Sequence, residues 1–327
     1  MSKYVDCVAL EDDKVCSHMQ ISKKKKGYGR ELRDNVYYWL LSLPAVLYFF
    51  IFCYLPMFGV VIAFKNYNYS DGILGSEWVG FRNFKFFFTS QDALVITRNT
   101  VCYGIAFMIT GIITSVLVAL LLFEIKEKLA IKMYQTIIIL PNFLSWVIVS
   151  YITYILLDPR LGVLNHLFEA LKITPLQWYT EPKYWPAILT VVNVWKNVGM
   201  SAIVYYAALM GIDSELYEAA KIDGARRIHQ TWYISIPLLM PLMTILSVLS
   251  LGSILRGDFG LFYQIPRNVG TLYPTTDIID TYVYRGLATG DLSATTAIGL
   301  FQSVAGLILV LLSNWIVKKI EPENSMF

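Results

Sequence analysis

The stretch that decides the fold class runs from residue 99 to residue 123 and reads NTVCYGIAFMITGIITSVLVALLLF. It contains no charged side chain, and its few polar residues are separated by long apolar runs. A helix needs about 20 mostly apolar residues to cross the ~30 Å hydrocarbon core of a bilayer. We therefore expect residues 99–123 to form a membrane-spanning helix.

Five further segments pass the same test of length and apolarity. Pro44 and Pro56 lie inside the first of them, and we expect that helix to be bent because proline donates no backbone hydrogen bond. The fold class predicted is an all-α membrane protein with six transmembrane helices. The expected spans are 38–64, 99–123, 131–157, 186–210, 237–255 and 294–317.

The composition of the whole chain agrees with this class. Of the 327 residues, 56% are hydrophobic and only 16% are charged, and the mean hydropathy is +0.53. Soluble globular domains carry about 25% charged residues. The net charge of +3 is too small to indicate a nucleic-acid partner. We predict no catalytic, cofactor-binding or metal site, because the spacing of the cysteines and histidines matches no metal or disulfide pattern: Cys7, Cys16, Cys53, Cys102, His18, His166 and His229.

The distribution of Lys and Arg predicts the orientation in the membrane. A dense basic run within 23–33 precedes the first span, and segments expected inside carry more Lys and Arg than the outer loops. Basic residues favour the cytoplasmic side, so both termini are expected in the cytoplasm. The predicted domains are a cytoplasmic tail 1–33, a transmembrane domain 34–320 and a cytoplasmic tail 321–327. The first apolar segment is too long for a cleaved signal peptide and is expected to stay as an anchor.

The cytoplasmic segment between the fourth and fifth spans, 211–236, is expected to be helical. Its core, with the start of the next span, reads DSELYEAAKIDGARRIHQTWYISIPLLMP over 213–241. Asp213 or Ser214 is suited to cap a helix, and Gly224 is suited to the left-handed residue that ends one. The residues alone leave two possibilities open: a hairpin that merely connects two spans, and a helix–turn–helix that docks on another protein.

The spacing within this segment resembles the coupling-loop signature of ABC importer permeases. Glu218-Ala219-Ala220 is followed by Asp223-Gly224 and then by Ile234-Ser235-Ile236-Pro237, with Ile236 where the family usually has Leu. The resemblance extends from about residue 33 to 320 and favours the carbohydrate-uptake branch. It includes WVGFRNFKFFF (78–88), ILPNFLSWVIVSYI (139–152), NVWKNVG (193–199) and TDIIDTYVYRG (276–286). No loop is long enough for the large outer insertion of maltose-type relatives.

The resemblance implies a division of labour among several chains. A second, different permease subunit would complete the pathway, two ATPase subunits would dock on residues 214–237, and an extracellular or periplasmic binding protein would deliver a carbohydrate. The location implied is a bacterial cytoplasmic membrane. The chain has no Gly-x4-Gly-Lys-Ser/Thr phosphate loop, so we expect ATP hydrolysis by a separate chain and no enzymatic activity here. The coupling residues implied are Glu218, Ala219, Ala220, Asp223, Gly224, Ile234 and Pro237.

Polar residues inside the spans are candidates for the solute pathway, because polar groups in hydrocarbon are costly. The fourth span contains Asn193, Trp195, Lys196 and Asn197, and the resemblance supports Lys196 and Asn197 as pocket residues. We favour a cavity-facing Lys196 over a buried ion pair. Ser250 and Ser253 in the fifth span are equally consistent with solute binding and with helix packing, whereas Gly111 and Ser115 are interpreted as a packing pair.

Three other classes of protein remain as alternatives. An ABC permease for a polyamine or a peptide would share the coupling loop. An ion-coupled transporter would be expected to carry acidic residues inside its spans, and a membrane enzyme would need a catalytic constellation at one depth. Neither of these two features is evident in the sequence.

Overall fold

The computed structural model describes residues 36–320. The predicted tails 1–33 and 321–327, including the basic run at 23–33, lie outside these residues. The described residues divide into two compact units, residues 36–58 and residues 59–320. The predicted domain boundaries are not tested by this division.

The described part of the first unit is helical throughout. α2 (Val36–Phe49) contains Pro44 and is followed by a π-helical turn, η2 (Phe50–Tyr54), and by α3 (Leu55–Met57). None of their residues is buried. Such an all-round apolar and exposed surface suits lipid or a partner chain.

A proline explains the position of the π-helical turn in the first unit. Pro56 has no N–H to give to the carbonyl of Phe52, four residues earlier, and Phe52 lies in the middle of η2. The wider turn bonds the Leu55 N–H to the Phe50 carbonyl instead. A second π-helical turn, η6 (Thr231–Ser235), stands in the same relation to Pro237 and bonds the Ile236 N–H to the Thr231 carbonyl.

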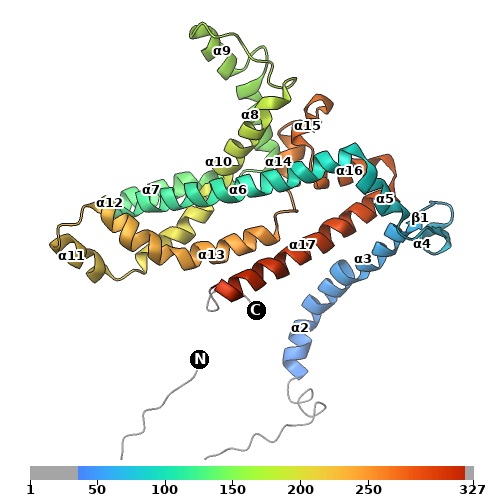
Figure 1. Cartoon of the computed structure of the whole chain (residues 1–327), viewed down its shortest axis with the longest axis horizontal. Helices are drawn as coiled ribbons and strands as arrows, with labels where there is room; N and C mark the ends of the chain where they lie inside the picture. Colours follow the sequence, from blue (N-terminus) through green and yellow to red (C-terminus); the bar gives the residue numbers. More distant parts are fainter. Residues whose placement is uncertain (1–35, 321–327) are drawn as a thin grey trace, which may run out of the picture. The chain divides into compact units, whose positions relative to one another are not determined.

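Four long helices form the frame of the second unit. They are α6 (Gln91–Phe123), α10 (Trp185–Met210), α13 (Ile236–Gly252) and α17 (Leu292–Ile320). α6 packs along α10, and α13 packs against α6, α10 and α17 (Figure 1). By length and composition, five helices among the described residues could cross a membrane, or six if one bent pair is a single span.

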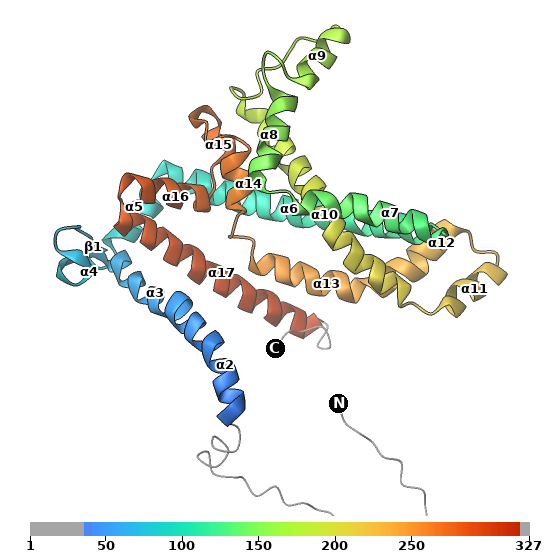
Figure 2. The same cartoon turned by 180° about the vertical axis from the view of Figure 1, so that it is seen from behind.

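The third expected span, 131–157, is formed by the bent pair. α7 (Lys128–Ile139) and the 3₁₀ turn η4 (Leu140–Phe143) are followed by α8 (Trp146–Leu157), with a bend of 98°. Leu144 and Ser145 are extended, and the Ser145 hydroxyl accepts the Ile148 N–H at 3.4 Å, which starts α8 as a new helix. In Figure 2, α8 and α9 (Val163–Ala170) project away from α6.

Short elements connect the long helices at the ends. One connection contains η3 (Phe58–Phe64), α4 (Gly72–Gly75), α5 (Arg82–Thr89) and a two-stranded antiparallel ribbon, in which β1 (Lys65–Asn66) pairs Lys65 with Trp78 of β2 (Glu77–Trp78). η5 (Pro182–Tyr184) leads into α10. Between α13 and α17 lie α14 (Phe259–Gln264), η7 (Gly270–Leu272), α15 (Tyr273–Thr276) and α16 (Ile279–Thr289).

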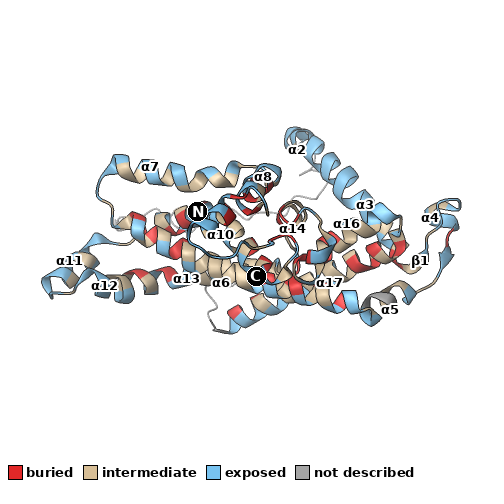
Figure 3. Ribbon diagram, turned by 90° about the horizontal axis from the view of Figure 1, so that it is seen from above, coloured by how far each residue is buried: buried red, intermediate tan, exposed pale blue. Residues whose placement is uncertain are grey.

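Two buried clusters stabilise the two ends of α10. Trp185 and Leu189, near its start, pack with residues of α14 and with Ile278. Tyr205 and Leu209, near its end, pack with α6 and α13. Figure 3 shows the buried residues concentrated between the helices, with exposed faces along α7, α11 (Ser214–Ile222) and α12 (Arg227–Gln230). The stretch of α10 between the two clusters borders a cavity.

Candidate functional site

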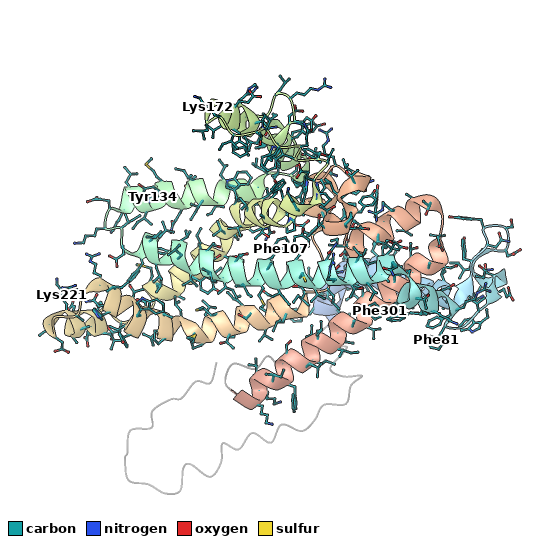
Figure 4. All side chains as sticks on the ribbon, turned by 45° about the horizontal axis from the view of Figure 1, so that its top comes forward. Phe81, Phe107, Tyr134, Lys172, Lys221 and Phe301 are labelled. Atoms are coloured by element: carbon teal, nitrogen blue, oxygen red, sulfur yellow. The ribbon has the colours of Figure 1, made fainter. Side chains whose placement is uncertain are left out.

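A cavity of about 380 Å³ lies between the middles of α6, α10 and the C-terminal half of α13. Phe107 of α6, labelled in Figure 4, lies midway along this frame. The lining is uncharged and mixes apolar side chains with hydroxyl and amide groups. Its polar members are Thr114, Ser115, Asn193, Asn197, Ser201, Tyr205, Ser250 and Ser253.

Two further cavities extend this space toward the segment after α13. A cavity of about 370 Å³ shares Asn193, Asn197, Ser250 and Ser253 with the first and reaches Arg256 and Asp258. Another, of about 450 Å³, shares Ser253 and Arg256 with the second and lies against α17. The shared residues indicate a polar path along one side of α13.

The two asparagines predicted from the fourth span meet at the cavity. They are one helical turn apart, and Asn197 Nδ2 donates to Asn193 Oδ1 at 2.9 Å. Asn142 of η4 donates from Nδ2 to Asn197 Oδ1 at 3.3 Å. A chain of three amides therefore connects the bend between α7 and α8 to the cavity wall.

The two serines predicted from the fifth span also border the cavities. Ser250 donates its hydroxyl to the Leu246 carbonyl at 2.9 Å, and Ser253 donates to the Ser250 carbonyl at 3.0 Å. A hydroxyl that donates to its own helix keeps its acceptor lone pairs. Both serines can therefore accept hydrogen bonds from a solute or from water.

Gly111 and Ser115 of α6, which the sequence predicts to be a packing pair, both lie beside the cavity. A Cβ added at Gly111 would have no atom within 4 Å. The Ser115 hydroxyl is 1% exposed and has no hydrogen-bond partner in the described chain. Buried polar groups are normally satisfied, so this hydroxyl is an exception among the described residues. The burial of Ser115 agrees with helix packing, whereas the space beside Gly111 is open.

Lys196 lies outside the cavity, which differs from the expectation. It is 7% exposed, and its Nζ donates to the carbonyls of Leu144 at 2.6 Å, Asn142 at 2.8 Å and Pro141 at 3.3 Å. The ammonium also lies 5.0 Å from the centre of the Trp146 ring. An ammonium has three donors, and all are used here. Lys196 thus holds the bend between α7 and α8, neither facing solute nor forming an ion pair.

Gly199, one turn beyond Lys196, allows the bend to approach α10 closely. A Cβ at this position would collide with the carbonyl of Ile138 at the end of α7. Trp195 is 42% exposed and borders none of the three connected cavities beside α13. Of the four residues predicted in the fourth span, only Asn193 and Asn197 therefore border the cavity.

The predicted coupling segment forms two helices joined by a tight turn. Asp213 caps α11 by accepting the Glu215 N–H at 3.0 Å. At the other end, Gly224 has φ +80°, its N–H donates to the Lys221 carbonyl, and the Ala225 N–H donates to the Ala220 carbonyl at 2.9 Å. This pair of bonds is the Schellman arrangement, in which glycine is favoured. Glu218, Ala219 and Asp223 are exposed on this hairpin.

The hairpin is tied to the helices that line the cavity. Arg227 of α12 forms an ion pair with Glu124 just after α6. The Tyr217 hydroxyl lies 2.9 Å from the Ser235 hydroxyl, and its ring lies 5.7 Å from that of Phe123. Ile234 is half-buried and Pro237 is exposed. These contacts connect the exposed hairpin to α6 and α13.

The comparisons with known proteins identify the family. Residues 111–324 match the family described as "Binding-protein-dependent transport system inner membrane component". The chain belongs to this family. Its matched region contains α10, α11, α12 and α13, and so includes the hairpin and most of the cavity wall.

Two curated relatives and a solved structure match nearly the whole chain. Protein LplB of Bacillus subtilis (strain 168) is 37% identical over 294 residues, covering 90% of this chain and 92% of that protein. The polygalacturonan/rhamnogalacturonan transport system permease protein YteP of the same organism is 36% identical, with coverages of 92% and 94%. A chain of a bacterial ABC transporter that imports the acidic polysaccharide alginate is 32% identical, with a TM-score of 0.82 over 90% of this chain and 99% of that chain.

Proposed function

We propose that this permease forms half of the translocation pathway of an ATP-driven importer for an oligosaccharide or polysaccharide. The observation that carries the proposal is the uncharged polar cavity between α6, α10 and α13, combined with the exposed hairpin attached to the same helices. The cavity would pass the solute, and the hairpin would receive force from an ATPase.

The lining of the cavity suits a saccharide. Amide groups of Asn193 and Asn197 and hydroxyls of Ser250 and Ser253 offer donors and acceptors for sugar hydroxyls. Phe107 supplies apolar ring surface beside them. Ligand sites typically combine a mostly apolar wall with a few fixed polar groups.

The named relatives support the same class of solute. YteP is named as a permease for polygalacturonan and rhamnogalacturonan, and the solved alginate transporter also imports a polysaccharide. One solved structure of the alginate transporter includes a periplasmic protein that holds an alginate pentasaccharide. By analogy, we propose a solute-binding protein as the delivery partner of this chain.

The proposed assembly contains several other chains. A second permease subunit would close the open side of the cavity, and two ATPase subunits would bind the hairpins at the cytoplasmic face. Closure of the ATPases would move residues 214–237, and the contacts through Arg227, Glu124 and Tyr217 would transmit this movement to α6 and α13. The chain itself would hydrolyse no ATP. It would lie in the bacterial cytoplasmic membrane with both termini inside.

Reconstitution of the complete importer in proteoliposomes tests the proposal. ATP-driven uptake of radiolabelled neutral and acidic oligosaccharides should occur with the wild-type chain and should be lost in Glu218→Lys, because the exposed carboxylate is replaced by a cation. Glu169→Lys on α9 is the matched control, since Glu169 is exposed but lies outside the hairpin. A wild-type importer that moves a peptide or a polyamine, but no saccharide, would contradict the proposal.

A further inference from the structure

Only three charged side chains border the three connected cavities formed by the described residues. They are Arg256 and Asp258 in the second cavity, and Arg256 and Asp280 in the third. The first cavity has no charged group in its lining. Which of these three groups can hydrogen-bond directly to a solute therefore depends on which of them already has a partner in the protein.

Both carboxylates are engaged in holding the backbone. Asp258 caps α14 by accepting the Leu261 N–H at 3.3 Å. Asp280 accepts the Gly257 N–H at 2.8 Å and the side-chain amide of Gln302 at 3.1 Å. Burial raises the pKa of Asp280, whereas the Gly257 N–H, Gln302 and the charge of Arg256 act in the opposite direction. These two groups position the segment after α13.

The Arg256 guanidinium is not engaged in this way. Its side chain is exposed to the cavities, and within residues 36–320 it makes no hydrogen bond and no ion pair within 4 Å. Its backbone is held on both sides, because the Arg256 N–H donates to the Ser253 carbonyl at 2.8 Å and Gly257 packs against Ile278. A fixed backbone thus presents to the polar path a guanidinium that has no hydrogen-bond partner among residues 36–320 and whose charge also acts on Asp280.

We propose that Arg256 binds an anionic group on the transported saccharide, a carboxylate or a phosphate ester, so that the solute class is an acidic saccharide. This inference rests on the proposed saccharide import and adds that the saccharide is negatively charged. A guanidinium binds such oxyanions through two parallel hydrogen bonds. Asn193, Asn197, Ser250 and Ser253, which border the same cavity as Arg256, would bind the neutral hydroxyls.

The test compares two anionic saccharides with one uncharged saccharide. Proteoliposomes with the complete importer and saturating binding protein would be given trigalacturonate, its methyl ester, or maltotriose phosphate. Arg256→Gln should slow uptake of the anionic solutes by roughly 10-fold, as expected for losing a hydrogen bond to a charged group. Uptake of the methyl ester should change less than about 2-fold, which also shows that the variant is folded.

Two control variants sharpen the result. Arg256→Lys keeps the charge but loses the paired donors, so its uptake of anionic solutes should fall between wild type and Arg256→Gln. Arg160→Gln removes an exposed arginine outside the cavities and should leave all uptake rates unchanged. Loss confined to maltotriose phosphate would identify a phosphate, and loss confined to trigalacturonate a carboxylate.

The inference and the proposed function fail in different ways. The wild-type importer could move the methyl ester but neither anionic solute, or Arg256→Gln could slow uptake of all three solutes equally. In either case Arg256 does not bind an anionic group of the solute, whereas the proposal of saccharide import stands. If wild type moves none of the three and no other saccharide, both are overturned.

Discussion

Lys196 is the residue whose role the structure changed most. Replacement by methionine keeps the apolar stem but leaves the carbonyls of Pro141, Asn142 and Leu144 without their donor. Unsatisfied buried polar groups cost about 1–3 kcal/mol, so Lys196→Met should lower the melting temperature of the purified complex. Lys183→Met is the matched control, because Lys183 is exposed, pairs with Glu181 at 2.8 Å and lies 4.6 Å from the centre of the Tyr184 ring, and exposed pairs contribute about 0–1 kcal/mol. Equal melting of the two variants would refute the role assigned to Lys196.

Two glycines in the long helices should respond in opposite directions to alanine. At Gly199 the new Cβ collides with the backbone of Ile138, which cannot rotate away, and overpacking of this kind costs about 1–3 kcal/mol. At Gly111 the same Cβ enters open space, and alanine is better than glycine in a helix by about 0.5–1 kcal/mol. Thermal unfolding in detergent should therefore show Gly199→Ala below wild type and Gly111→Ala at or above it. A stable Gly199→Ala would contradict the close approach of α7 to α10.

The hairpin made of α11 and α12 is the element that should separate coupling from folding. Gly224 and Gly290 both end a helix with positive φ, at +80° and +87°, so valine should strain both turns by about 1–2 kcal/mol. Only Gly224 lies in the hairpin. Gly224→Val should lose association with the ATPase subunits and ATP-driven uptake, whereas Gly290→Val should keep association despite a similar loss of stability. Pull-down of the ATPase from membranes measures this, and equal loss in both variants would argue against docking at the hairpin.

Prolines explain where two helices change their hydrogen-bond pattern. Both π-helical turns surround a carbonyl that a proline four residues later leaves without a donor: Phe52 before Pro56, and Tyr233 before Pro237. The sequence predicts an irregularity at such a proline, because the missing N–H is a local property. The sequence does not predict whether the helix forms a wider π-helical turn, as at Pro56 and Pro237, or bends by 98°, as between η4 and α8.

At the scale of the whole molecule, the orientation in the membrane makes a direct prediction. Lys172, beyond α9, and Lys221, on α11, lie in separate regions of the second unit (Figure 4). With the native cysteines replaced, Lys172→Cys should react with an impermeant maleimide in intact cells, and Lys221→Cys should react only after permeabilisation. The physical reason is that a charged reagent cannot cross the hydrocarbon core. The reverse labelling pattern would overturn the assignment of the hairpin to the cytoplasm.

The sequence by itself determined the membrane class, five of the apolar spans, and the two helices of the hairpin with their glycine turn. These features depend on local properties: apolar length, capping side chains and the freedom of glycine at positive φ. Asn193, Asn197, Ser250 and Ser253 were also found in this way, because polar groups stand out in an apolar helix. The structure places all four at the cavity, and their contact with solute stays a prediction.

Only the tertiary structure decided what each polar group meets. Lys196 and the carbonyls it binds are 52 to 55 positions apart in the chain, and they come together because Gly199 admits the end of α7 against α10. The Arg256 guanidinium has no hydrogen-bond partner among the described residues, whereas Asp258 and Asp280 accept backbone N–H groups that the fold supplies. Composition and spacing describe one segment at a time, whereas the partner of a buried or cavity-facing charge depends on which distant segment packs beside it.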